Sequence, residues 1–127
     1  LIRPPPRYTF FPYTPLFRSL LLMGRGGEGK SLLERLLDEQ PDYTAAQFML
    51  CAAHICMQER APAENLFRKL RSLPIGDYIG ESFLDISKRF ISASRIDDAR
   101  LILDTALSFG CETPAIKVLL EECRAAS

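Results

Sequence analysis

Apolar residues recur every three to four positions along most of the chain, from about residue 20 onward. This spacing is typical of helices that bury one face and expose the other. Six segments show the pattern, and short connections separate them. We expect helices within residues 31–41, 44–58, 61–74, 79–94, 97–110 and 113–124.

Residues that favour helix ends stand at the borders of these segments. Pro62 suits a first helical turn, and Asp97 with Asp98 starts another helix with a charge that complements its dipole. Gly110 stands where a helix stops, and Thr113–Pro114 is typical of a helix start. No segment alternates strictly between apolar and polar residues, as a half-buried strand does. The pattern therefore predicts an all-α fold of about six helices in antiparallel hairpins.

The second helix of each hairpin carries a repeated pattern. A small residue is followed four and seven positions later by apolar ones, and this triplet returns after 34 and then 36 residues. The three triplets are Gly29, Leu33 and Leu36; Ala63, Phe67 and Leu70; and Ala99, Leu103 and Ala106. In the first helices, Cys51 and Ser87 occupy an equivalent small-residue position. Two-helix units with a period near 34 residues indicate a helical repeat protein.

With this period, residues 20–127 resemble the tetratricopeptide-repeat family. The resemblance implies an α-solenoid fragment with a partial unit (20–42), two full units (43–76 and 77–112) and a terminal helix (113–127). The family's W-x-x-L-G opening is not kept: Gln47 and Cys51 stand near its aromatic and glycine positions in one unit, Phe83 and Ser87 in the next. A plain bundle of three hairpins is the alternative architecture.

The first 19 residues differ from the rest, because they are rich in proline and aromatic residues and contain no acid. The stretch RPPPRYTFFPYTPLFRS (3–19) resembles RRPPRSTLFPYTTLFRS, the translation of a common sequencing adapter. It departs from that peptide only at Pro4, Tyr8, Phe10 and Pro15. Transit peptides, by contrast, are amphipathic and rich in serine. We therefore expect residues 1–19 to be a non-native, extended or poorly packed segment, and the chain to be a fragment of a longer protein.

The charge balance changes when that segment is left out. The whole chain is neutral, and the segment holds Arg3, Arg7 and Arg18 but no acid, so the remainder is acidic by three charges. An acidic chain without a basic cluster disfavours nucleic acid and anionic membranes as partners. No apolar stretch approaches the length that crosses a bilayer.

Few side chains are candidates for chemistry. The four cysteines lack the C-x-x-C spacing of zinc sites and are typical of a reduced, cytoplasmic core; they are Cys51, Cys56, Cys111 and Cys123. His54 is the only histidine, and no Asp or Asn in an equivalent place completes a Cys–His nucleophile pair with it. We therefore expect no catalytic residue, no metal and no cofactor.

One motif points to different chemistry. GRGGEGKS (24–31) satisfies the phosphate-loop pattern G-x-x-x-x-G-K-[ST], in which Gly24 and Gly29 shape the loop, Lys30 reaches the terminal phosphates and Ser31 holds magnesium. Such a loop belongs to a parallel sheet, whereas only helical patterns follow here. In the repeat register Gly24 lies in the turn between two helices, LLLM (20–23) ends the first helix, and Lys30 is a solvated charge. A truncated nucleotide-binding protein is the alternative interpretation.

Taken together, these features favour a non-catalytic scaffold for protein–protein interaction. In the tetratricopeptide family the first helix of each unit lines a concave groove. The resemblance places there Ala45, Phe48, Ala52, Ile55, Glu81, Leu84, Lys88 and Ile91. Because this set is mostly apolar, we expect a protein or peptide partner with an apolar or helical segment, and self-association through exposed terminal faces as a second mode. Alternatively, the chain is the repeat appendage of a larger enzyme, such as a bacterial glycosyltransferase.

Overall fold

The computed structural model describes residues 19–20, 22–73 and 78–126, and this part of the chain is all-α. The expected conformation of residues 1–18 lies outside the described residues. The described helices are α2 (Gly26–Glu39), α3 (Thr44–Cys56), α4 (Arg60–Arg71), α5 (Ile79–Ser92), α6 (Ile96–Ser108) and α7 (Pro114–Ala126). The prediction of an all-α fold with about six helices is confirmed, and each helix falls in or near its expected segment.

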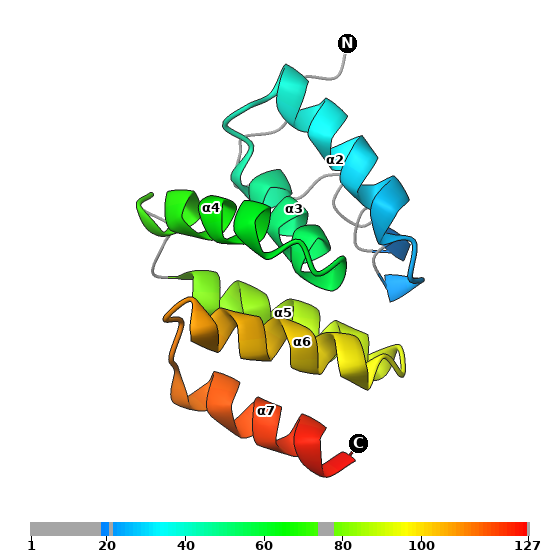
Figure 1. The fold of residues 1–127 in the computed structure, drawn as a ribbon, viewed down its shortest axis with the longest axis vertical. Helices are drawn as coiled ribbons and strands as arrows, with labels where there is room; N and C mark the ends of the chain where they lie inside the picture. The colour runs from blue at the N-terminus through cyan, green and yellow to red at the C-terminus, as the bar shows by residue number, and fades with distance from the viewer. Residues whose placement is uncertain (1–18, 21, 74–77, 127) are drawn as a thin grey trace.

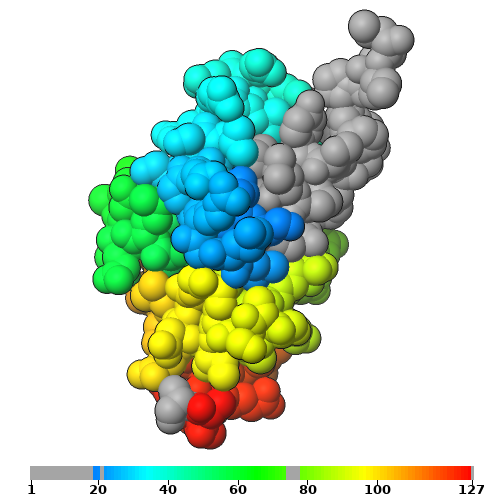
Figure 2. Space-filling model, turned by 90° about the vertical axis from the view of Figure 1, so that its right-hand side faces the viewer, coloured from blue at the N-terminus to red at the C-terminus, as the bar shows by residue number. Residues whose placement is uncertain are grey.

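The helices form an elongated stack of two-helix units (Figure 1). Each of α3 and α5 packs along the helix that follows it, α4 and α6 respectively, while α2 packs on α3 and α7 on α6. Contacts between α3 and α6 and between α5 and α7 join helices that are not consecutive. Figure 2 shows the same order in the space-filling view, from the α2 end at the top to α7 at the bottom.

The turn within each unit has the same geometry three times. A residue with positive φ stands in each turn: Gly24 at 76°, Gln58 at 59° and Ser94 at 63°. The next amide, that of Arg25, Glu59 or Arg95, donates to a carbonyl five residues earlier, and all three bonds measure 2.8 Å. The prediction that Gly24 lies in a turn and not in a strand-to-helix loop is confirmed, because Ser19, Leu20 and Leu22 before it are helical.

The structure shows where the residues predicted at helix ends lie. At the start of α7, Thr113 Oγ1 accepts a hydrogen bond from the Ile116 amide at 3.2 Å, as expected of a capping threonine. Gly110 ends α6 with φ of 95°, as expected. Helix α6 begins at Ile96, with Arg95 as its N-cap, directly before the expected Asp97 and Asp98. The two aspartates lie in the first turn, where they complement the helix dipole.

The repeated triplet forms the core side of the second helices. All of its members are buried, and so are the small residues Cys51 and Ser87 of the first helices. Cys51 Sγ lies 3.3 Å from the Ala63 carbonyl oxygen, to which it donates, so α3 and α4 approach closely at two small residues. The equivalent pair in the next unit is Ser87 and Ala99, also fully buried. Small residues therefore set the spacing between the two helices of a unit.

An aromatic cluster joins the two full units. The Phe67 ring of α4 lies 6.1 Å from the Phe83 ring of α5 and 5.1 Å from the ring of Phe109, which follows α6. Two guanidinium groups cover its edge, Arg60 over Phe109 at 5.0 Å and Arg71 over Phe67 at 5.7 Å. These contacts combine apolar burial with cation–π attraction at the interface between units.

The hydroxyl group of Ser87 lowers the stability of this core. Its hydroxyl is fully buried and has no hydrogen-bond partner among the described residues, whereas Cys51 at the equivalent position has one. A buried hydroxyl without a partner lowers stability, because it has lost its bonds to water. We expect Ser87→Ala to raise the free energy of unfolding by about 1 kcal/mol. Urea unfolding measures this, with the exposed Ser92→Ala as the control within α5, and a loss of stability in Ser87→Ala would contradict the expectation.

Candidate functional site

The α5 half of the expected groove forms one continuous face. Glu81, Leu84, Lys88 and Ile91 follow one another at spacings of three, four and three residues, which places them on the same side of a helix. Leu84 and Ile91 are half-buried, and both charged residues are exposed. The face therefore offers two apolar side chains to solvent, Leu84 between the two opposite charges and Ile91 beyond Lys88.

The α3 half of the groove is only partly accessible. Ala45 and Phe48 are half-buried, and the Phe48 ring contacts the Phe83 ring of α5 edge-on at 5.1 Å. Ala52 and Ile55, by contrast, lie in the hydrophobic core with exposed fractions of 0% and 2%. They are buried because α3 packs against three helices, namely α2, α4 and α6. The accessible candidates are thus the α5 face and the two residues at the start of α3.

The GRGGEGKS segment is helical for most of its length. Helix α2 begins at Gly26, and the Gly29 amide donates to the Arg25 carbonyl at 3.1 Å. Gly29 is buried, and Ser31 Oγ donates to the Gly27 carbonyl one turn back. A phosphate-binding loop uses such amides and the hydroxyl to hold phosphate and magnesium. In this structure Gly29, Lys30 and Ser31 instead contact the protein itself.

Lys30 belongs to a polar network with Glu59 and His54, which was not predicted from the sequence. Its ammonium group lies 3.1 Å and 3.3 Å from the two carboxylate oxygens of Glu59, and His54 Nδ1 lies 2.8 Å from one of them. An ionised carboxylate only accepts hydrogen bonds, so His54 Nδ1 carries the hydrogen. The expectation that Lys30 is a solvated charge is wrong, since its side chain is only 22% exposed and pairs with a residue 29 positions away. The network ties α2 to the turn between α3 and α4.

The Glu59 carboxylate makes stability depend on pH. Hydrogen bonds from His54 and then from Lys30 hold the pKa of Glu59 below its usual value. A group whose pKa is lowered by folding stabilises the protein above its unfolded pKa, and this contribution disappears as pH falls through the folded value. We expect the stability advantage of the native protein over Glu59→Gln to shrink as pH falls from 7 to about 3, below the usual carboxyl pKa.

Urea unfolding at pH 7 and pH 3 measures the advantage. The exposed acid Glu39 of α2 provides the matched control, because Glu39→Gln removes a charge nine residues away from Lys30. An advantage over Glu59→Gln that stays constant across the pH range would contradict the network's role.

The cysteines are poor nucleophiles. Burial raises the pKa of both Cys51 and Cys56 to about 12, and it also raises the pKa of Cys111 and Cys123. The reactive form of a cysteine is the thiolate, which such thiols do not form near neutral pH. None of the four forms a disulfide. Among the residues it describes, no group of three His, Cys, Asp or Glu side chains is arranged to hold a metal ion.

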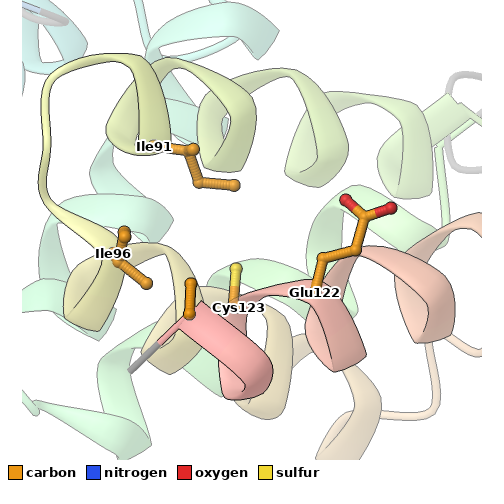
Figure 3. A pocket seen from close by; sticks show the side chains of 5 residues that line it. Ile91, Ile96, Glu122 and Cys123 are labelled. Carbon is orange, nitrogen blue, oxygen red and sulfur yellow. The ribbon is translucent and has the colours of Figure 1, made fainter.

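A hollow of about 230 Å³ opens beside α7, at the end of the stack farthest from α2 (Figure 3). Ile91 at the end of α5 and Ile96 at the start of α6 form one wall, and Glu122, Cys123 and Ala126 of α7 form the other. The lining is apolar except for the Glu122 carboxylate. Ile91 thus connects the α5 face to this hollow.

No protein-family model, no curated protein and no solved structure matches the chain. The family expected from the repeat therefore stays a prediction. Within the described ranges, no helix combines the length and the apolar character needed to cross a bilayer.

Proposed function

We propose that the chain is a non-catalytic scaffold built from tetratricopeptide-like repeats, acting in the cytoplasm. The observation that carries the proposal is the α5 face, where Leu84 and Ile91 stay partly accessible although their helix has a full core side. Apolar side chains held on a rigid helix, with charges beside them, are features of a docking surface for another polypeptide. Phe48 extends this surface toward α3 through its contact with Phe83.

The chemistry of the face specifies the partner. Glu81 and Lys88 carry opposite charges and lie one on each side of Leu84 along α5. Such a surface has no net charge, so it favours an apolar or amphipathic helix over an acidic or basic tail. We expect a partner helix with apolar residues at three- and four-residue spacing and one residue of each charge near its ends.

A displayed library of 16-residue peptides, selected against the purified protein, tests this proposal. We expect the selected peptides to be amphipathic, and we expect their binding, measured by fluorescence anisotropy, to weaken at least about tenfold in Leu84→Gln, a loss of about 1.4 kcal/mol. Met57→Gln is the matched control, since Met57 is an exposed apolar residue of the α3–α4 turn. Peptides that bind Leu84→Gln as tightly as the native protein would contradict the proposed surface.

A nucleotide titration tests the competing interpretation of GRGGEGKS. The contacts of Gly29, Lys30 and Ser31 with the protein itself favour the scaffold. We expect no saturable ATP binding in the presence of magnesium. Saturable binding that disappears in Lys30→Ala would overturn the scaffold proposal and favour a nucleotide-binding protein.

A further inference from the structure

The hollow beside α7 has the size of one large apolar side chain. Ile91 of α5 and Cys123 of α7 point into the same space, and Ile96 closes one side of it (Figure 3). Cys123 is 1% exposed and forms the floor, whereas Ile91 and Ile96 are half-buried. The volume of about 230 Å³ exceeds the roughly 150 Å³ of a cavity that holds benzene, and it falls below the roughly 300 Å³ at which pockets for drug-sized molecules begin.

The hollow continues the α5 face onto α7. Leu119, Glu122 and Ala126 follow one another at spacings of three and four residues, so they share one side of α7. Glu122 and Ala126 line the hollow together with Ile91, the last apolar residue of the α5 face, so this side of α7 is turned toward that face. A helix that lies along the α5 face, from Leu84 toward Ile91, therefore ends at the hollow.

Glu122 places a negative charge at the rim of the hollow. Its carboxylate is exposed and makes no ion pair within the described residues. The neighbouring acid Glu121, by contrast, pairs with Arg124 at 3.2 Å. Arg124 also pairs with Asp104 of α6 at 3.1 Å, so the arginine of α7 is engaged on another side of the helix. Glu122 can thus pair with a cation from outside the chain.

The field at the hollow is negative. Burial, and after it the Glu122 charge, raise the pKa of the Cys123 thiol, and the smaller effect of Arg100 lowers it. The hollow lies at the C-terminal ends of α5 and α7, where the helix dipoles are negative. The positive end of α6 lies there too, but the two aspartates in its first turn offset that charge. A cation at the rim is therefore favoured over an anion.

We propose that the hollow takes one large apolar side chain of the partner helix, and that Glu122 pairs with a lysine or arginine three or four residues from that side chain. The proposal rests on the scaffold function proposed above and specifies the partner more closely. Lys88, one turn before Ile91, selects an acidic residue of the same helix, so the partner carries both charges, with the basic one at the hollow. An apolar side chain in a pocket closed to water contributes much of the binding energy at many interfaces, while a charge pair at the rim adds specificity.

Fluorescence anisotropy with the selected 16-residue peptides tests whether the hollow is occupied. Ala126→Leu fills the hollow with a side chain of the protein itself, and we expect it to weaken binding at least about tenfold. Ala125→Leu is the matched control, because Ala125 is an exposed neighbour on α7 that does not line the hollow, and it should leave the affinity unchanged. Circular dichroism of each variant checks that its helical content is that of the native protein.

A charge exchange tests the role of Glu122. We expect Glu122→Lys to weaken binding about threefold or more. A peptide whose basic residue is replaced by glutamate should bind the native protein weakly and regain affinity only with Glu122→Lys. A fault in folding would not produce this coupling, since it would weaken both peptides alike. Glu112→Lys, at an exposed site before α7 begins, is the control and should change neither affinity.

The outcomes separate this proposal from the scaffold function. Leu84→Gln removes a contact of the α5 face, whereas Ala126→Leu changes only the hollow. Binding that is weakened by Leu84→Gln but unchanged or tighter in Ala126→Leu would overturn the hollow as an anchor site and leave the scaffold standing. Absence of coupling between Glu122 and the basic residue of the peptide would overturn the charge pair. A library that yields no binder would overturn both proposals, because the second depends on the first.

Discussion

Replacing Phe67 with alanine is expected to lower the free energy of unfolding by about 3–5 kcal/mol, the usual loss for a large aromatic side chain removed from a core. Phe67 is 2% exposed, and its ring contacts the rings of both Phe83 and Phe109. Its removal leaves a cavity at the interface between units as well as within one unit. The second unit should then lose contact with the first, and unfolding should become less cooperative.

Urea unfolding followed by circular dichroism measures both effects. The midpoint gives the loss of stability, and the slope of the transition gives the loss of cooperativity. Lys69→Ala is the control on the same helix, because Lys69 is exposed and should change stability by less than about 0.5 kcal/mol. A loss below about 1 kcal/mol in Phe67→Ala would contradict the central place of this ring in the core.

Enlarging Ala63 to leucine should lower the free energy of unfolding by about 1–3 kcal/mol, the usual effect of overpacking a core. Ala63 is fully buried, and its carbonyl accepts the Cys51 thiol at 3.3 Å, so the larger side chain must push α3 and α4 apart. Ala99 occupies the same place between α5 and α6. We therefore expect Ala99→Leu to cause a loss of similar size.

Comparing Ala63→Leu with Ala99→Leu tests whether the two units share the same close contact between their helices. Ala61→Leu serves as the control, since Ala61 is an exposed residue of α4 whose enlargement should change stability by less than about 0.5 kcal/mol. Thermal unfolding of the three variants ranks them. If Ala63→Leu were destabilising and Ala99→Leu neutral, the two units would not share the close helix contact that their spacing of 36 residues implies.

The helices and the turn at Gly24 could be predicted from the sequence because their determinants are local. Pro41 follows the end of α2, and Gly110 has the positive φ that helix ends favour. The positive φ of Gln58 and Ser94 was not predicted, because neither residue type signals it. Those two turns become visible only when the chain is aligned with itself at the spacing that relates Gly29, Ala63 and Ala99.

The candidate site was harder to predict because it depends on contacts distant in sequence. Lys30 looked solvated since its partner, Glu59, is 29 positions away and belongs to the next turn. Ala52 and Ile55 looked accessible because the helical period says which residues share a face, but not how many helices cover it. The α5 residues share one side of their helix, since spacings of three and four residues decide that question alone, but their role as a groove stays a prediction.

The three turns with positive φ give the chain a modular character. Each second helix begins from the same backbone conformation and the same 2.8 Å bond, whichever unit it belongs to. A duplicated copy of residues 59–94 joined after Ser94 would thus start and finish at junctions of matching geometry. Duplication of such a unit would lengthen the array without requiring a turn of a different geometry.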